Sequence, residues 1–561
     1  MVKFIQKNRV QGYACLFVLA LGLLQTPYNV QAAQEIATTQ QMAEQGSTEA
    51  QFELGTDYIQ GNGVAKDMPQ AALWLRKAAE QGHSNAQTLL GSLYANGEGV
   101  EKDTQQAVTW FRKATEQGSA FAQLSLGQMY ESGEGVEKDM QQAFNLYRKA
   151  AEQGLSDAQL NLGYMYANGE GVTKDMKQAV AWYRKAAEQG VAQAQFLLGG
   201  SYESGEGIPQ NSQQAVVWYR KAAEQGYAPA QFSLGTYYEF GAGVTKDMKQ
   251  AATWYRKAAE QGDKGGQYAL GYSYANGEGV AQDMQQALVW YRKAAEQGSA
   301  GAQFALGEAY ESGKVLALDS QQAVYWYRKA AEQGHANAQY RLGLSYTTGE
   351  GIEKDSQQAL TWFRRAAEQG HAKAQFLLGL SYTTGDGVTQ DAQQAIAWYR
   401  KAAMQGDVSA QYALGAIYYY GKGVAKDMKE AFTWYRKAAE QGDVSAQHNI
   451  GVMYAQGVGV IKDVKQAVIW YRKAAEMGHA NAQFNLGVMY LLGEGVKQDN
   501  SNAYVWLSVG VANGSPDPQA LRDSVAKKLS QPQLASAQKL AGQYFEKYQS
   551  RSRRQPLVEP T

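Results

Sequence analysis

Five histidines and one recurring aspartate are the residues of this sequence whose types and spacing could do chemistry. The histidines are His83, His335, His371, His448 and His479. All except His448 directly follow a glycine, where a histidine can cap a helix end or lie in solvent, and they are too far apart to form one metal site without a coincidence of folding. The HExxH, phosphate-loop, GxSxG and dinucleotide-binding motifs are absent. We therefore expect no catalytic, cofactor-binding or metal-binding residues, and no enzymatic activity.

The recurring aspartate begins with Asp67 and returns as Asp103, Asp139 and Asp175 at intervals of 36 residues. A catalytic carboxylate is expected to be unique. An aspartate that precedes a helix can instead accept from the first free N–H groups and suits the positive end of the helix dipole. Gln70, three residues after Asp67, fits the reciprocal arm of a capping box. We therefore interpret this aspartate as the start of a helix.

The 36-residue interval is a repeat that organises almost the whole chain, without an insertion in any copy. A fixed period of about 20–50 residues is the mark of a solenoid or a similar array. The sequence therefore predicts an all-α solenoid of about thirteen helix pairs with helical caps. The copies begin at Gln51, Gln87, Gln123, Gln159, Gln195, Gln231, Gln267, Gln303, Gln339, Gln375, Gln411, Gln447 and Gln483.

Each copy is interpreted as two helices joined by a short loop. In the first copy, Leu54 and Tyr58 lie on one face of a helix that should stop at Gly61. The second helix should run from Asp67 to Gly82, because glycine is the favoured residue just after a helix end. A glycine follows Leu54 and recurs in every copy, at a cost of about 0.5–1 kcal/mol relative to alanine. That repeated cost predicts the close approach of another backbone.

The shared pattern, LGxxYxxGxGVxKDxxQAxxWYRKAAEQGxxxAQ, resembles the Sel-one-like repeat family, a branch of the tetratricopeptide-like helical repeats. The resemblance covers residues of about 33–514 and implies antiparallel helix pairs stacked into a right-handed α-solenoid that binds other proteins. It also implies that the first helices line the concave side. Some members of the family carry a disulfide in each repeat, and this chain does not, because its single cysteine is Cys15.

The sequence outside the repeats predicts three further kinds of segment. Residues 1–32 are interpreted as a signal peptide, with Lys3, Lys7 and Arg9 before a short apolar run and cleavage after Ala32; an uncleaved N-terminal anchor is the alternative. Residues 33–50 match the end of a second helix and are interpreted as a half-repeat cap before the array, 51–514. Residues 515–548 are expected to form a C-terminal helical cap, and 549–561 a disordered tail.

One loop departs from the pattern. Where other copies have a second loop glycine, this copy has Val315. A β-branched residue is poorly suited to positive φ. Either this loop has a different conformation, or the glycine of the other loops does not have positive φ. The substitution is interpreted as local sequence variation, and the alternative is that it changes the rotation between neighbouring repeats of the superhelix.

Charge balance limits the class of partner. The chain has 53 Lys and Arg against 53 Asp and Glu, so its net charge is near zero. This balance argues against a nucleic-acid partner held by bulk electrostatics. We expect another protein as partner, no nucleic acid, no metal, and no stable membrane insertion once the signal peptide is removed.

The candidate partner-binding residues lie on the first helices, where the copies differ. The early copies place Glu131, Glu203 and Glu239 on this face, whereas later copies place apolar and aromatic residues there. Exposed apolar patches of this kind mark partner sites. The alternative is that packing between repeats covers them. The candidates are Leu344, Leu380, Tyr419, Tyr420, Leu491 and Leu492.

These features predict a non-catalytic protein-binding solenoid exported from a bacterial cytoplasm, to the periplasm, the cell surface or the medium. A host immunoglobulin-type protein is one partner that the resemblance suggests. The alternative is a periplasmic scaffold or a toxin-neutralising protein, and the least favoured is hydrolysis of a β-lactam or a peptidoglycan amide.

Overall fold

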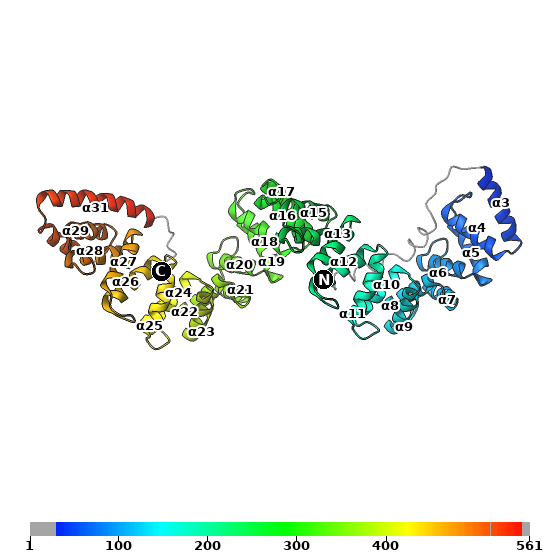
Figure 1. Ribbon diagram of the computed structural model, residues 1–561, viewed down its shortest axis with the longest axis horizontal. Coiled ribbons are helices and arrows are strands. Elements are labelled where there is room, and N and C mark those ends of the chain that lie inside the picture. The colour runs from blue at the N-terminus through cyan, green and yellow to red at the C-terminus, as the bar shows by residue number, and fades with distance from the viewer. Residues whose placement is uncertain (1–29, 516–517, 553–561) are drawn as a thin grey trace. The chain divides into compact units, whose positions relative to one another are not determined.

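The chain folds as a succession of short α-helices (Figure 1). The computed structural model describes residues 30–515 and 518–552, and in these ranges it has 29 α-helices and no β-strand. The chain divides into two compact units, an N-terminal unit, Met1–Trp290, and a C-terminal unit, Tyr291–Thr561. The predicted signal peptide lies outside the described residues, except that residues 30–32 form the first turn of a helix.

The first helices of the repeats each span 13 residues and occur once in every 36. They are α4 (Thr48–Gln60), α6 (Ser84–Asn96), α8 (Ala120–Ser132), α10 (Ser156–Asn168), α12 (Ala192–Ser204), α14 (Ala228–Phe240), α16 (Lys264–Asn276), α18 (Ala300–Ser312), α20 (Ala336–Thr348), α22 (Ala372–Thr384), α24 (Val408–Tyr420), α26 (Val444–Gln456) and α28 (Ala480–Leu492).

The second helices have the same length. Inside each unit a second helix packs on the first helix of its own repeat and on the first helix of the next, which confirms the prediction of an all-α solenoid. They are α5 (Met68–Glu80), α7 (Thr104–Glu116), α9 (Met140–Glu152), α11 (Met176–Glu188), α13 (Ser212–Glu224), α15 (Met248–Glu260), α17 (Met284–Glu296), α19 (Ser320–Glu332), α21 (Ser356–Glu368), α23 (Ala392–Met404), α25 (Met428–Glu440), α27 (Val464–Glu476) and α29 (Asn500–Ala512).

The helix ends follow from local chemistry. The carboxylate of Asp67 accepts a hydrogen bond from the Gln70 N–H at 3.0 Å, so the predicted N-cap is confirmed. The Asp67 N–H donates to the Tyr58 carbonyl at 3.0 Å, so the prediction that Gln70 closes a capping box is wrong. Gly61 and Gly82 lie at φ +78° and +95°, as expected of the residues that end the two helices.

The glycine after Leu54 makes room mainly for a side chain. A Cβ on Gly55 would lie 2.8 Å from Leu75 Cγ and 3.2 Å from the Leu75 backbone nitrogen. In most later repeats the nearest atoms belong to an aromatic ring, such as Tyr183 beside Gly163. The prediction that another backbone approaches this glycine is therefore only partly right, because the nearest atoms belong to a side chain of the second helix.

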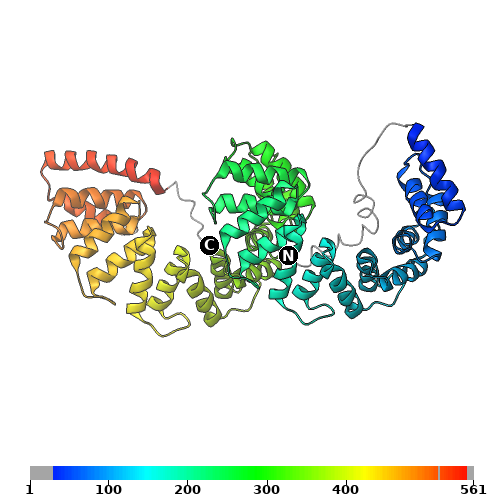
Figure 2. The ribbon, with the colours of Figure 1, turned by 45° about the vertical axis from the view of Figure 1, so that its right-hand side comes forward.

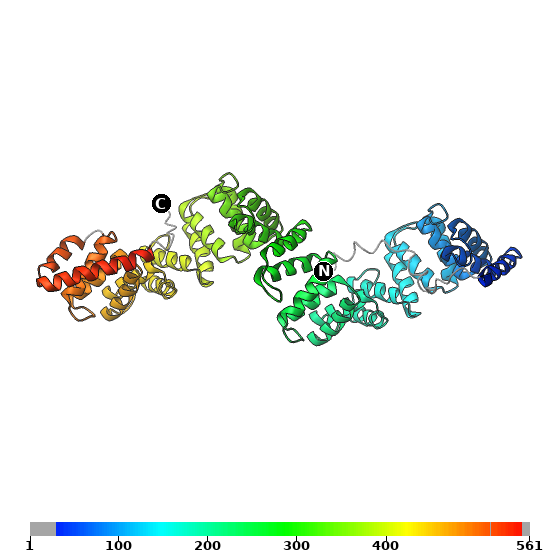
Figure 3. The same ribbon diagram turned by 90° about the horizontal axis from the view of Figure 1, so that it is seen from above.

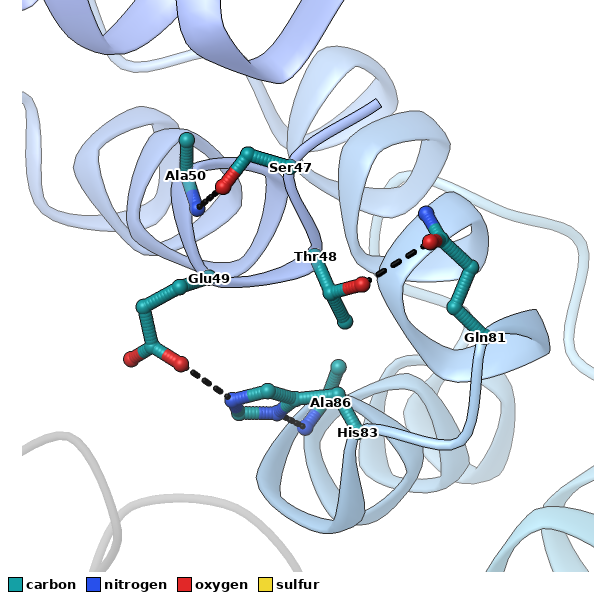
Figure 4. Close-up of polar contacts among 7 residues, drawn as sticks. All are labelled: Ser47, Thr48, Glu49, Ala50, Gln81, His83 and Ala86. Atoms are coloured by element: carbon teal, nitrogen blue, oxygen red, sulfur yellow. Dashed lines mark hydrogen bonds and ion pairs between the residues drawn. The ribbon is translucent and has the colours of Figure 1, made fainter. Parts of the chain in front are cut away.

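Consecutive repeats are joined by a buried ladder of glutamines, whose first members are Gln51 and Gln81. The Gln51 amide donates to the Ala43 carbonyl of the preceding helix at 3.0 Å, and the Gln81 amide donates to Gln51 Oε1 at 2.7 Å. The same junction carries a bond from the Thr48 hydroxyl to Gln81 Oε1 at 2.8 Å (Figure 4). Buried amides need such partners, so the ladder aligns each repeat with its neighbour.

The loop at Val315 has a different shape from the others. The second loop glycine has positive φ in the other twelve loops, for example +70° at Gly99, whereas no described non-glycine residue has positive φ. In eleven of those loops, from Gly99 onward, a Cβ would also collide with the start of the preceding second helix, as at Gly351, where it would lie 2.1 Å from the Ser320 carbonyl oxygen. Val315 therefore leaves this arrangement, and Leu318 beside it is exposed.

Three further helices stand at the ends of the array. α3 (Val30–Glu44) lies against α4 (Figure 2) and supplies the Ala43 carbonyl to the ladder, as a second helix would. α30 (Pro518–Ala526) and α31 (Gln531–Ser552) pack on α29, and α31 crosses the last helix pair (Figure 3). α31 continues to Ser552, so residues 549–552 of the predicted disordered tail are helical; residues 553–561 lie outside the described part of the chain.

Candidate partner-binding face

The first helices carry a row of glutamates in the N-terminal unit, and each is held by a tyrosine of the second helix. The Tyr147 hydroxyl donates to Glu131 at 2.6 Å and the Tyr219 hydroxyl donates to Glu203 at 2.5 Å. Burial, and then the bond to Glu203, raise the pKa of Tyr219. Each such pair places a fixed, uncharged phenol and a carboxylate on the face, so this part is polar.

The same face begins as a charged surface in the C-terminal unit. Tyr327 donates to Glu311 at 2.9 Å. The Arg341 guanidinium lies 3.3 Å from Glu311 and 3.7 Å from Glu308. Burial raises the pKa of Glu308 above its ordinary value, and Arg341 opposes that rise. Glu308 and Glu311 are therefore both paired with the Arg341 guanidinium.

From α20 onward the glutamate position is taken by residues without charge, and the first of them is Thr347. Thr383 fills it in α22 and shares a hydrogen bond with the Tyr399 hydroxyl at 3.0 Å. Tyr419 fills it in α24, and Leu491 fills it in α28. The predicted loss of acidic residues towards the C-terminus is thus present, and it coincides with the loss of the tyrosine–glutamate bond.

The predicted partner-binding residues differ in exposure. Tyr420 and Leu492 are 60% and 57% exposed. Leu344, Leu380 and Tyr419 are half-buried. We call these five residues, Leu344, Leu380, Tyr419, Tyr420 and Leu492, the docking face.

Leu491 does not belong to the docking face. Its side chain is only 9% exposed and lies in one apolar cluster with Val525 of α30 and Ala537 of α31. The C-terminal helices cover it, so the prediction that Leu491 contacts a partner is corrected. The helices that cover Leu491, α30 and α31, follow the last repeat, so the repeat pattern alone does not predict its burial.

Tyrosines gather around the centre of the docking face. The Tyr419 ring lies 5.0 Å from Tyr420 at an interplanar angle of 77°, and 6.4 Å from Tyr435. Tyr435 lies 5.5 Å from Tyr412. Tyr418 is buried at the packing position, as expected for three successive tyrosines on one helix. Tyr412 and Tyr435 were not predicted, although both occupy positions that are aromatic in many repeats.

Phe240 is a large apolar residue on the equivalent position of the N-terminal unit. It ends α14 as Tyr420 ends α24, and it is 71% exposed. The interpretation of the early face as polar or acidic is wrong at this position. Phe240 is therefore the natural internal control for Tyr420.

Four of the histidines are N-caps of first helices. Nδ1 of His83 accepts from the Ala86 N–H at 3.1 Å, while its Nε2 lies 3.3 Å from Glu49 (Figure 4). His335, His371 and His479 cap in the same way. Among the described residues, no three His, Cys, Asp or Glu side chains are grouped to hold a metal ion.

In the same part of the chain no helix combines the length and apolarity needed to cross a membrane.

The fold and this face define a class, an all-α repeat solenoid of the kind that holds other proteins. More specifically, the chain belongs to the Sel1 repeat family. Sel1 repeat proteins are generally protein-interaction scaffolds, and the fold is typically non-catalytic. The Sel1 repeat matches residues 48–83, 84–119, 120–155, 156–191, 192–227, 228–263, 265–299, 300–335, 336–371, 372–407, 408–443, 444–479 and 480–515.

Solved structures of the same family share substantial identity with the chain. One is c5321, described as a protective antigen present in uropathogenic Escherichia coli strains, with 37% identity, 94% of this chain and 98% of that chain covered, and a TM-score of 0.37. A Sel1 repeat protein from Oxalobacter formigenes has 37% identity, with 55% and 90% covered and a TM-score of 0.43. Cysteine rich protein B of Helicobacter pylori has 34% identity, with 23% and 92% covered and a TM-score of 0.20. These TM-scores are below 0.5, so the family assignment rests on sequence. No curated protein matches the chain.

Proposed function

We propose that this chain is an exported, non-catalytic scaffold that binds a partner protein on the docking face of its C-terminal unit. The observation that carries the proposal is the exposure of Tyr420 and Leu492 at the last position of their first helices. The residue before them takes the place at which an N-terminal repeat, such as that of Glu131, holds a carboxylate bonded to tyrosine. Burying exposed aromatic and aliphatic side chains against a partner is favourable, because it removes apolar surface from water.

Tyr420 is the expected anchor of the interaction. It carries a large ring with a hydroxyl that can still form a hydrogen bond, and such residues dominate binding energy in many interfaces. Tyr419 lies beneath it against Tyr435, so the ring of Tyr420 rests on a packed aromatic base. An anchor supported in this way is partly immobilised before binding, which reduces the entropy lost on association.

The proposal is tested with a partner recovered by the purified chain and identified by mass spectrometry. Tyr420→Ala combined with Leu492→Ala should weaken binding by about 2 kcal/mol or more, which is roughly a 30-fold rise in Kd. The matched control is Phe240→Ala, which removes an even more exposed aromatic residue from the same repeat position in the N-terminal unit. Unchanged affinity of the double variant, or an equal loss in the control, would contradict docking on this face.

Export is a separate part of the proposal. Its support is the sequence pattern of residues 1–32 and the 37% identity to a protein described as a protective antigen of a bacterial pathogen. A host immunoglobulin-type protein is the partner class to be tried first. Fractionation of the native host separates this function from a periplasmic scaffold: recovery in the medium or on intact cells supports the first, and confinement to the periplasm supports the second.

A further inference from the structure

The junction that leads into α28 differs from the other junctions of the C-terminal unit in two independent ways. The first is a break in the glutamine ladder. Met477 stands where other repeats have the glutamine that donates to the ladder, and Gln447 Oε1 is consequently buried without a hydrogen-bond partner in the described part of the chain. The neighbouring junction is intact, with Gln441 donating to Gln411 at 2.8 Å.

The second difference is a stack of two histidines. The ring of His448, on α26, lies 4.6 Å from the ring of His479 at an interplanar angle of 21°. At two other junctions of the unit the capping histidine stacks on a ring that does not titrate near neutral pH: His335 lies 4.8 Å from Phe304, and His371 lies 4.6 Å from Tyr340. The α28 junction therefore contains two ionisable imidazoles in contact.

The hydrogen bonds around the stack are those of two neutral rings. Nδ1 of His479 accepts from the Ala482 N–H at 3.2 Å and so carries no proton. His448 Nε2 faces the Asn485 amide nitrogen at 3.1 Å, and its Nδ1 faces Asn449 Oδ1 at 3.3 Å, an arrangement in which Nε2 accepts and Nδ1 donates. Rotation of the Asn485 amide could accommodate a proton on His448, but it would not remove the charge from the stack.

In the described part of the chain, the groups that contact the pair carry no negative charge. The groups in contact are Asn449 of α26, Asn485 of α28 and the phenol of Tyr471 on α27, 6.0 Å from His448. Burial raises the pKa of Tyr471, so that phenol is neutral. Burial and then His448 lower the pKa of His479 to about 4.

We propose that the His448–His479 stack makes the junction into α28 a pH-sensitive joint, which opens on acidification before the other junctions of the unit. Protonation of His479 removes the acceptor that caps α28 and places a positive charge at the positive end of the helix dipole. Protonation of His448 adds a second like charge at stacking distance. The unpaired Gln447 oxygen lowers the stability of the same joint at every pH.

Proton linkage gives the direction in which pH changes the stability of the joint. Both rings bind protons more weakly when folded than when unfolded, because burial lowers the pKa of His448 as well as that of His479. The stability of the joint is therefore complete above about pH 6.5 and is lost as the pH falls towards 4. For His479 alone, a pKa that drops from 6.5 to about 4 implies an opening constant that rises on the order of 30-fold between pH 8 and pH 5.

Amide hydrogen exchange on the full chain between pH 8 and pH 5, corrected for the intrinsic exchange rate, tests the proposal. The opening constant of α28 should rise more steeply with acidity than those of α20 and α22, because two protons are taken up instead of one. His448→Phe should reduce the slope to that of α20, whose His335 already stacks on phenylalanine. Equal slopes in the three helices of the unaltered chain would overturn the proposal.

A second variant keeps the test decisive if His448→Phe disturbs packing. His479→Ser retains a capping oxygen, like that of Ser299 at α18, but does not titrate. It should flatten the pH dependence of α28 while leaving exchange at pH 8 within a few-fold of the original. An unchanged slope in His479→Ser would refute the role of the stack. Both measurements use the free chain, so their outcome is independent of the proposed partner binding.

Discussion

Substitutions at the second-helix end of the glutamine ladder should change the stability of a single junction in opposite directions. Met477→Gln should supply the donor that Gln447 Oε1 lacks. Gln441→Met should create the same defect one junction earlier, because the Gln441 amide donates to Gln411 Oε1 at 2.8 Å. The two substitutions exchange the same pair of side chains, so differences in side-chain volume largely cancel between them.

The expected magnitudes come from the burial of the acceptor. Gln411 is only 3% exposed, so an unpaired Oε1 there should cost about 1–3 kcal/mol. That cost corresponds to an opening constant about 5- to 150-fold higher. Gln447 is 8% exposed and its oxygen can recover some solvation by a small movement, so Met477→Gln should gain only about 1 kcal/mol, or roughly a 5-fold slower opening.

Local hydrogen exchange is the appropriate assay, because a long repeat array does not unfold as one two-state unit. Exchange in α24 should accelerate in Gln441→Met, and exchange in α26 should slow in Met477→Gln. Gln357→Met, at an exposed position of α21, is the control and should change exchange by less than about 0.5 kcal/mol. If Gln441→Met leaves α24 unchanged, the ladder does not stabilise the junctions and the reasoning fails.

Two further predictions concern helix ends and helix packing. Asp175→Ala should lower stability by about 0.5–2 kcal/mol, because the Asp175 carboxylate accepts hydrogen bonds from the Lys177 and Gln178 N–H groups. Amide hydrogen exchange should rise in α11 and its neighbours, and an equal rise in every repeat would contradict local coupling. Gly199→Ala should destabilise α12 by about 1–3 kcal/mol, since the new Cβ would lie 2.7 Å from the Tyr219 ring. Gly200→Ala is the matched control, because the Tyr219 hydroxyl, the nearest neighbour of the new Cβ, would lie 3.6 Å away. Thermal melting of this variant should show a stability gain of about 0.5–1 kcal/mol. A stability loss as large as that of Gly199→Ala would refute the packing explanation.

The parts of the fold that could be predicted from sequence are those set by neighbouring residues. Asp67 and Gly61 mark helix ends through bonds and backbone angles within a few residues, and the 36-residue period repeats those signals thirteen times. The role of Gln51 could not be predicted in the same way. Its partners are Ala43, across a turn, and Gln81, thirty residues later, and a polar residue on a helix is more often exposed than buried.

For the candidate site, the sequence indicated the change in chemistry but not the exposure of each residue. The replacement of Glu131 and Glu203 by uncharged residues later in the chain is visible when the repeats are aligned with one another. The burial of Leu491 is not visible, because it depends on α30 and α31, which are not part of the repeat. Phe240 does not stand out either, because it is a single exceptional residue beside one of the recurrent glutamates.

The uniform junctions also determine how a protein of this kind can change its length. The junctions at Gln375 and Gln411 are each made by two glutamines and a backbone carbonyl. Removing residues 375–410 would therefore bring Gln411 into the place of Gln375, with the same donors and acceptors on both sides. Duplication or loss of 36 codons would therefore preserve the reading frame, the core and the joints at once. Leu380 would be lost with the removed residues, and the spacing between Leu344 and the tyrosines of α24 would shorten by one helix pair. The distance between the remaining contact points on such a protein is thus adjustable in fixed steps of one helix pair.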